Sequence, residues 1–302
     1  MQPLFWTLLL ITGLGAEPAF AQPFRTQTAP PGRPPVEAQQ AFQAKMDEQT
    51  FILARDQGFR HLSQRERQAL LEFVVGNVLI VALRQVGLAL LSELSLPAVA
   101  GADQVADDFA VLAVLELGKS HFSDRILMEA AKGWFTSMRR KEPARASSKY
   151  EQSVTARRAY RMICLMAGAD AVRFKALAEE TALPRSLQRN CGWDYDRALR
   201  NWGIVLGPYR PRADQPKTRI DVSYGAADGN LAIYPQVFRN LGFLEVIAEV
   251  TASEVTWRAP VAIEMRSCGA VVATWIASTR TLSVCYEMAE DFAELYRDFA
   301  RR

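Results

Sequence analysis

The sequence predicts an α+β fold that is mostly helical and has its β structure in the C-terminal third. Two observations carry this prediction. From about residue 37 to residue 203, apolar residues recur with the period of a helix. After the Pro-rich segment GPYRPRADQPK, the stretch TRIDVSYG alternates polar and apolar residues as a strand does.

The first 21 residues have the layout of a secretory signal peptide. The apolar stretch PLFWTLLLITGLG is followed by small residues at Ala19 and Ala21, and cleavage is expected after Ala21. No Lys or Arg precedes the apolar stretch, so retention as an N-terminal anchor is the alternative. Because the stretch is short for a bilayer span, we expect export to the periplasm or the extracellular space, with no transmembrane span after cleavage.

The segment that follows the signal peptide is predicted to be a linker. Residues 22–36, QPFRTQTAPPGRPPV, are rich in Pro and polar residues, which favours an extended chain. We assign residues 22–40 to this linker and residues 41–302 to a single domain.

Seven helical patterns precede the β region. Ser63, with Glu66 three residues later, predicts the start of the second, and Pro97 and Gly101 mark its end. Residues 73–91 are apolar enough for a membrane helix, but Arg84 lies near their middle and would cost about 2.5–3.5 kcal/mol there. A buried helix of a soluble domain is the better interpretation. The patterns cover residues 37–56, 62–96, 103–118, 123–140, 149–167, 171–181 and 186–203.

The C-terminal third is expected to mix strands with helices. Residues 218–225 read as a strand and residues 240–256 as a helix. Residues 259–269 and 279–287 read as two strands joined by a turn, and residues 285–300 as a closing amphipathic helix.

The charge of the chain gives no indication of a nucleic-acid partner. The formal net charge is +3, and the basic clusters lack the interleaved aromatic residues of a single-strand binder. The two basic clusters are Arg139-Arg140-Lys141 and Arg157-Arg158-Arg161, and we interpret both as solvated helix faces.

The four cysteines are an even number, which suggests disulfides in an exported protein. Three pairings are open, and the order along the chain favours Cys164–Cys191 and Cys268–Cys285. Buried free thiols are the alternative. No C-x-x-C or Cys/His cluster indicates a structural zinc site.

Few residues suggest catalysis. The two histidines, His61 and His121, each lack a second His at i+4, and no G-x-S-x-G elbow or P-loop is present. Asp103 and Asp107 are spaced i,i+4 on a predicted helix, with Asp108 alongside. These acids either bind a hard metal or simply favour the dipole at a helix N-terminus.

Three stretches resemble one known family. FVVGNVLIVALRQVGLALLSELSLPAVAGADQVADDFAVLAVL is similar to the central segment of a bacterial, exported putative metallopeptidase family of unknown function, of H-E-L-G-H-A type. LPRSLQRNCGWDYDRALRNWGIVLGPY and RSCGAVVATWIASTRTLSVCYEM are similar to two later elements of that family. The resemblance spans about residues 68–297 and implies a zinc-metallopeptidase-like helical core.

The resemblance also implies a zinc site, which this sequence does not complete. In H-E-x-x-H, two His side chains at i and i+4 bind zinc and the Glu acts as general base. The matching positions here are Arg84, Gln85 and Leu88. Arg has no lone pair to offer, Gln takes no proton from water and Leu has no donor atom. We therefore expect no zinc and no other cofactor.

The other matching motifs are also altered. Asp103 and Gln104 stand where the family has E-E and Val105 where it has Asp, whereas Asp108 is retained, as is Glu93 on the preceding helix. In the C-terminal motif, four residues differ from the family pattern and five agree with it. The first group is Ser267, Val272, Trp275 and Ile276; the second is Cys268, Gly269, Cys285, Tyr286 and Glu287.

Two expectations follow for Arg84 and for function. We expect Arg84 to pair with Asp108 or Asp103 and to supply positive charge in place of a metal, unless its stem carries the guanidinium to solvent. The chain is then a catalytically inactive family member that binds a peptide or protein partner. The alternative is residual or rebuilt hydrolase activity in the same region, using Asp103, Asp107, Asp108 or His121.

Overall fold

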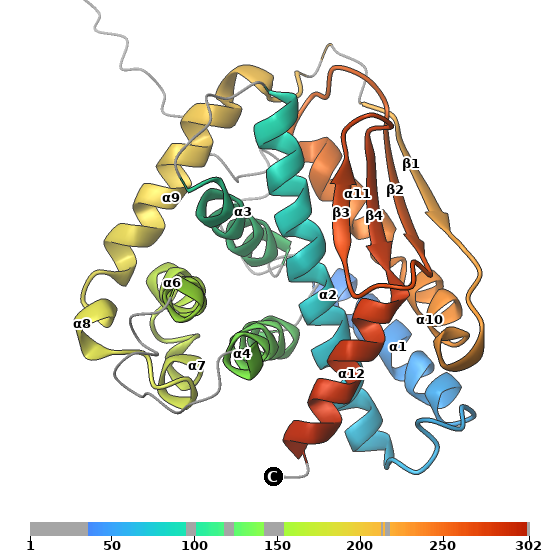
Figure 1. Cartoon of the computed structure of the whole chain (residues 1–302). Coiled ribbons are helices and arrows are strands. Elements are labelled where there is room, and N and C mark those ends of the chain that lie inside the picture. Colours follow the sequence, from blue (N-terminus) through green and yellow to red (C-terminus); the bar gives the residue numbers. More distant parts are fainter. Residues whose placement is uncertain are drawn as a thin grey trace, which may run out of the picture.

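The computed structural model describes residues 36–94, 101–117, 124–141, 154–212, 214 and 218–300. Within them the protein is mostly helical and carries one four-stranded sheet in its C-terminal third, as the sequence predicts. In Figure 1 one long helix runs through the centre, with a group of helices on one side and the sheet on the other. The predicted signal peptide and most of the predicted linker lie outside the described residues.

The first two thirds of the chain are helical. The linker was predicted to reach residue 40, but the first helix begins at Val36, so its last five residues are helical. The elements are α1 (Val36–Leu53), α2 (Gln64–Glu93), α3 (Ala102–Leu117), α4 (Asp124–Lys141), α6 (Val154–Ala169), α7 (Lys175–Glu180), α8 (Arg185–Gln188), α9 (Cys191–Leu206) and the 3-10 turn η1 (Gly207–Tyr209).

The last third mixes the sheet with three helices. The elements are β1 (Ile220–Tyr224), the 3-10 turn η2 (Gly229–Leu231), α10 (Tyr234–Leu241), α11 (Phe243–Glu254), β2 (Val261–Arg266), β3 (Ala273–Ile276), β4 (Thr281–Cys285) and α12 (Tyr286–Ala300).

Helix α2 is the centre of the core. It starts as predicted, at a capping box. The Ser63 side chain accepts a hydrogen bond from the Glu66 amide, and the Glu66 carboxylate accepts one from the Ser63 amide. By length and composition α2 could cross a membrane, but most of its apolar window is buried inside the protein. Buried helices need no polar face, which explains an apolar run that continues around the whole helix.

Two glycines allow neighbouring helices to approach α2 closely. A Cβ at Gly76 would lie 2.8 Å from the carbonyl oxygen of Ile126 in α4. A Cβ at Gly87 would lie 3.2 Å from the Cα of Ala106 in α3. A larger residue at either position would push the partner helix away.

The sheet has the order β1-β2-β4-β3. Strands β1, β2 and β4 run parallel, and β3 pairs antiparallel with β4. The two strands predicted within residues 259–269 and 279–287 are present as β2 and β4, but the prediction that a turn joins them was wrong. The short strand β3 lies between them in sequence and reverses the chain, so that β2 and β4 become parallel neighbours.

Three predicted helices differ from the observed ones. Residues 171–181 form only the short α7, and residues 186–203 are divided between α8 and α9. The helix predicted at residues 240–256 begins only at Phe243, because Gly242, with a φ of 67°, adopts a left-handed conformation and ends α10.

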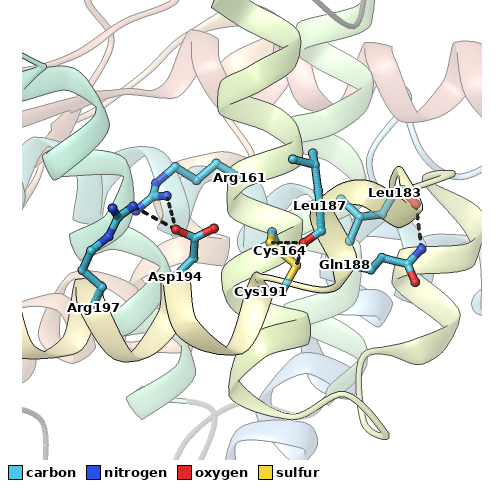
Figure 2. Close-up of a disulfide and its surroundings, with 8 residues drawn as sticks. All are labelled: Arg161, Cys164, Leu183, Leu187, Gln188, Cys191, Asp194 and Arg197. Atoms are coloured by element: carbon cyan, nitrogen blue, oxygen red, sulfur yellow. Dashed lines mark hydrogen bonds and ion pairs between the residues drawn. A yellow bond between two sulfur atoms is a disulfide. The ribbon is translucent and has the colours of Figure 1, made fainter.

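Both favoured disulfides are present. Cys164–Cys191 joins α6 to the first residue of α9 (Figure 2), and Cys268–Cys285 joins the segment after β2 to the end of β4. Two disulfides in one chain favour an oxidising, extracytoplasmic location.

Helices α6 and α9 cross at a third glycine, which provides a test of the packing. A Cβ at Gly168 would overlap the carbonyl oxygen of Cys191, whereas one at Gly192 would meet nothing within 4 Å. We expect Gly168→Ala to lower the free energy of unfolding by about 1–3 kcal/mol. Gly192→Ala should raise it by a few tenths to about 1 kcal/mol. Urea unfolding with both disulfides intact measures the difference, and equal effects of the two substitutions would contradict the close crossing.

Candidate functional site

In its C-terminal half, α2 has one stripe that is less buried than the residues beside it. From Leu70 to Ile80 every residue is buried, but farther along the helix some side chains are half-buried. The 3.6-residue repeat places residues at i, i+3, i+4 and i+7 on the same face. That face carries Val81, Arg84, Gln85 and Leu88, so the three positions that the family resemblance singles out lie together.

Helix α3 brings acidic groups to this stripe. Its close approach at Gly87 places the first two turns of α3 beside Arg84. Asp103 and Asp107 are one helical turn apart and point in the same direction, as their spacing predicts. Asp108 is rotated by about 100° around α3 and points to Arg161 of α6, away from Arg84.

Arg84 pairs with both acids on its side of α3. Its Nη2 binds Oδ1 of Asp103, and its Nε donates to Oδ1 of Asp107 at 2.8 Å. The predicted ion pair is therefore confirmed for Asp103, with Asp107 as a second partner; Asp108 is not a partner. The Arg84 side chain is 14% exposed, so its guanidinium is not carried to solvent.

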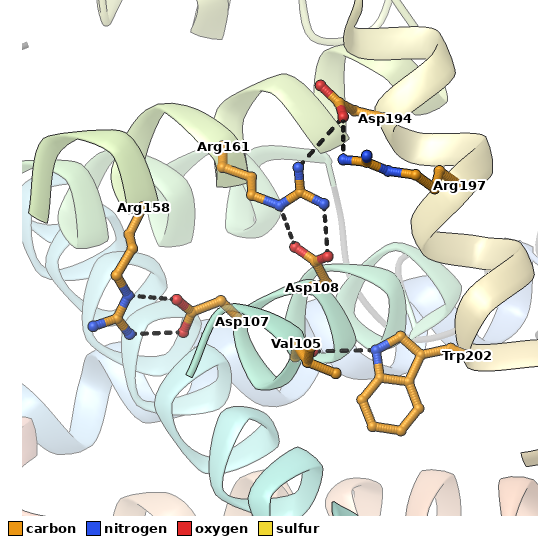
Figure 3. Close-up of polar contacts among 8 residues, drawn as sticks. All are labelled: Val105, Asp107, Asp108, Arg158, Arg161, Asp194, Arg197 and Trp202. Atoms are coloured by element: carbon orange, nitrogen blue, oxygen red, sulfur yellow. Dashed lines mark hydrogen bonds and ion pairs between the residues drawn. The ribbon is translucent and has the colours of Figure 1, made fainter. Parts of the chain in front are cut away.

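Asp107 is shared by the guanidinium groups of Arg84 and Arg158, and Figure 3 shows the second of these contacts. Arg158 of α6 donates from Nε to Oδ2 at 2.7 Å and from Nη2 to Oδ1 at 3.0 Å. Asp107 is buried, with only 6% of its side chain exposed. A bidentate pair with Arg158 and a further bond from Arg84 compensate for the removal of its charge from water.

Asp108 begins a second chain of ion pairs. Arg161 of α6 binds it with two bonds of 2.7 Å and also lies 3.5 Å from Oδ1 of Asp194 in α9. Asp194 accepts a further bond of 2.8 Å from Arg197. Figure 3 shows that the two guanidinium groups of this series alternate with its two carboxylates across α3, α6 and α9, so that the formal charges of these four residues balance.

Burial and pairing act in opposite directions on these groups. Burial raises the pKa of Asp108 above its ordinary value, although the hydrogen bonds from Arg161 oppose the shift. The bidentate bond to Asp107 raises the pKa of Arg158. Burial works against the charge of Arg161, but its acidic partners outweigh it and raise the pKa of this group. Both arginines are therefore charged at any pH at which the protein is folded.

The interpretation of Arg157-Arg158-Arg161 as a solvated helix face was wrong for two of its three members. Arg157 is exposed, but Arg158 and Arg161 point inward to adjacent acids of α3. The signal in the sequence was the i,i+3 spacing of two arginines on a helix with a buried apolar face. Nothing in the sequence indicated which acids they meet. The side chains of Arg139-Arg140-Lys141 lie outside the described residues.

The remaining candidate residues are placed as follows. Gln104 is exposed, and the carbonyl of Val105 accepts a bond of 3.1 Å from the Trp202 indole. His61 is exposed in the turn before α2, and His121 lies outside the described residues. Gln85 and Leu88 are half-buried beside Arg84.

Glu287 organises the C-terminal motif. Its carboxylate accepts bonds from the Ser267 hydroxyl at 2.7 Å and from the amides of Cys268 and Gly269 at 2.9 and 2.7 Å. Partial burial tends to raise the pKa of Glu287, but the hydrogen bonds from these donors outweigh it, so the pKa is lowered from its ordinary value. A carboxylate oxygen of Glu287 and the sulfurs of Cys268 and Cys285 lie within 4.8 Å of one another, a grouping that could in principle hold a metal ion. The two sulfurs are joined in a disulfide, however, and offer no thiolate.

Glu93 has a structural role at the end of α2. It pairs with Arg280, which precedes β4 in a left-handed conformation with a φ of 53°. Arg280 also donates to the carbonyls of Ala259 and Pro260. The pair therefore ties the end of α2 to the turn between β3 and β4.

Asp108 and Arg161 provide a test of how the network is held. In Arg161→Met, Asp108 stays buried without its bidentate partner, and we expect a loss of about 3–5 kcal/mol in the free energy of unfolding near pH 7.5. Arg161→Met/Asp108→Asn should recover most of the loss. Arg84→Met should cost less than Arg161→Met, because Asp107 retains Arg158 and Asp103 is 67% exposed.

The same variant gives a pH dependence with a defined sign. Burial raises the pKa of Asp108 in the folded state, so the folded Arg161→Met variant binds a proton more readily than its unfolded chain does. Its stability therefore rises relative to the wild type as the pH falls from 7.5 to 5. Urea unfolding at several pH values measures the free energy of unfolding of the variant relative to the wild type. A difference that does not change with pH would contradict the prediction that Asp108 is left buried and unpaired in the variant.

Comparison with known proteins identifies the region that contains this site. Residues 46–206 match the family DUF4344, which is described as "Putative metallopeptidase". The matched range is more than half of the 302 residues. No curated protein and no solved structure matches the chain. The matched region begins within α1 and ends with α9, so it includes Arg84 and every ion pair of the network but not the sheet. The chain therefore belongs to this putative metallopeptidase family.

Proposed function

We propose that this protein is a member of its family that works without a catalytic metal and acts by binding a peptide or protein outside the cytoplasm. The observation that supports it most directly is the position of Arg84. Its guanidinium lies between Asp103 and Asp107, on the stripe of α2 where the family resemblance assigns the zinc ligands.

The side chains on the α2 stripe do not fit a divalent cation. Arg84 carries a permanent positive charge and no lone pair, and Leu88 has no donor atom. Gln85 offers only an amide, which cannot act as a general base toward water. A zinc site needs three protein ligands with nitrogen, oxygen or sulfur donors, and Asp103 and Asp107 are the nearby groups of that kind.

Those acids are already neutralised. The network contains four arginines and four aspartates, so its formal charge is balanced: Arg84, Arg158, Arg161 and Arg197 against Asp103, Asp107, Asp108 and Asp194. A dication would have to displace guanidinium groups from buried carboxylates and leave their charges uncompensated. Ion pairing thus supplies here the positive charge that a metal would supply.

The second candidate function is a hydrolase rebuilt around Asp103, Asp107 or Asp108. A general base or nucleophile of this type needs a carboxylate that is free to reach a substrate. Asp107 and Asp108 are instead buried in bidentate pairs, and Asp103 binds Arg84. These contacts favour the binding function over the hydrolase.

Metal content tests the proposal. We expect the purified protein, incubated with an equimolar amount of zinc and then desalted, to retain less than about 0.1 equivalent by elemental analysis. Zinc and chelators should leave its melting temperature unchanged, and labelled casein should not be cleaved with or without zinc. One equivalent of retained zinc, or cleavage that a chelator abolishes, would overturn the proposal.

A gain-of-ligand variant is the matched control. Arg84→His/Gln85→Glu/Leu88→His places two imidazoles at i and i+4 and releases Asp103. We expect this triple variant to retain more zinc than the wild type and to melt at a higher temperature when zinc is added. The single change Leu88→His keeps the Arg84 pairs and should retain no more zinc than the wild type.

A further inference from the structure

Helix α9 presents a continuous outward face. Its buried side chains, Cys191, Ala198, Trp202 and Leu206, pack toward the core. The opposite side, which we call the α9 outer face, consists of Trp193, Asp196, Arg197, Arg200 and Ile204. At 100° per residue these five positions fall within about one third of the helix circumference.

Two large apolar side chains are exposed on this face. Trp193 is 59% exposed and Ile204 is 76% exposed. They are separated by eleven residues, or about 16 Å along the helix. A single exposed apolar residue needs no explanation, but a tryptophan and an isoleucine in line on one face, with arginines between them, resemble the centre of a protein interface.

Trp193 is held in place before any partner binds. The guanidinium carbon of Arg197 lies 4.3 Å from the centre of the Trp193 ring. Arg197 is in turn fixed by Asp194, which also contacts Arg161 (Figures 2 and 3). The ion-pair network therefore extends from the interior to the tryptophan, and a side chain that is already ordered loses less entropy on binding.

The surroundings of this face are basic. Arg185, Arg189 and Arg200 are exposed and form no ion pair within the described part of the chain. Arg197 uses one of its five N–H donors on Asp194. Asp196 is the acid on the α9 outer face, so the positive groups outnumber the negative ones and complement a partner that carries carboxylates.

We propose that the α9 outer face, with Arg185 of α8 and Arg189 directly after α8, is the docking surface for an acidic protein segment. This segment presents carboxylates to Arg189 and Arg200 and an aromatic or aliphatic side chain to Trp193. The inference deepens the proposed binding function and rests on it. An anionic membrane fits less well, because an interfacial helix inserts a broad apolar face, and that face of α9 is buried in the protein.

The test uses a random library of displayed 12-residue peptides, with the purified protein as the target. We expect the selected peptides to carry two or more Asp or Glu residues close to an aromatic or aliphatic residue. Binding of the synthetic peptides, followed by fluorescence polarisation, should weaken at least tenfold in Trp193→Ala and in Arg189→Glu/Arg200→Glu. It should also weaken as salt is raised from 0.05 to 0.5 M.

Matched controls separate this surface from general effects of charge and apolar area. Phe51→Ala removes another exposed aromatic side chain, 56% exposed on α1, and Arg55→Glu/Arg258→Glu makes the same change in net charge elsewhere. Both should bind within about twofold of the wild type. Unchanged melting temperatures of the α9 variants show that they fold.

Three results would overturn the inference. They are a selection that yields no acidic peptides, binding that survives the α9 variants, and binding to phosphatidylglycerol vesicles in place of peptides. Peptide binding that survives the α9 variants would reject this surface and leave the proposed function standing. Retained zinc, with peptide binding still dependent on Trp193, would reject the metal-free proposal alone.

Discussion

The arrangement of the helical part depends on two consecutive buried acids in α3. Asp107 and Asp108 point about 100° apart, so they meet different partners. Asp107 binds Arg84 of α2 and Arg158 of α6, and Asp108 binds Arg161. A buried carboxylate without a partner is costly, so α3 holds its neighbours in one relative position.

Packing and charge act together at this point. Gly87 lets α3 approach α2 closely enough for Arg84 to reach both Asp103 and Asp107. Helix α9 also contacts α3. The indole N–H of Trp202 donates a hydrogen bond to the Val105 carbonyl, and the ring centres of Trp202 and Phe109 are 4.9 Å apart. The Cys164–Cys191 disulfide fixes α6 to α9 beside the second chain of ion pairs. The same contacts that hold the helices together therefore also occupy the carboxylates near the α2 stripe.

Much of the fold could be predicted from local patterns. Helix α2, its capping box and the common direction of Asp103 and Asp107 follow from spacing along the chain, and the order of the cysteines favoured the two disulfides that are present. The break between α10 and α11 did not, because a left-handed Gly242 inside an apolar run has no distinct signature. Strand β3 is four residues long, too short for an alternating pattern, and its absence from the prediction made β2 and β4 look like a hairpin.

The sequence by itself determined the helical class and the kinds of side chain at residues 84, 85 and 88, because these depend on residue identity and on neighbours along the chain. It favoured one of three cysteine pairings, which the structure then confirmed. Only the tertiary structure decided that Arg84 forms an ion pair with Asp107 as well as with Asp103, and that Asp108 pairs with Arg161. It also decided that Arg158 and Arg161 point to buried acids and not to solvent. Those partners are separated by 23 to 53 residues in the chain. Their meeting depends on how closely α2, α3 and α6 pack, which no local pattern encodes.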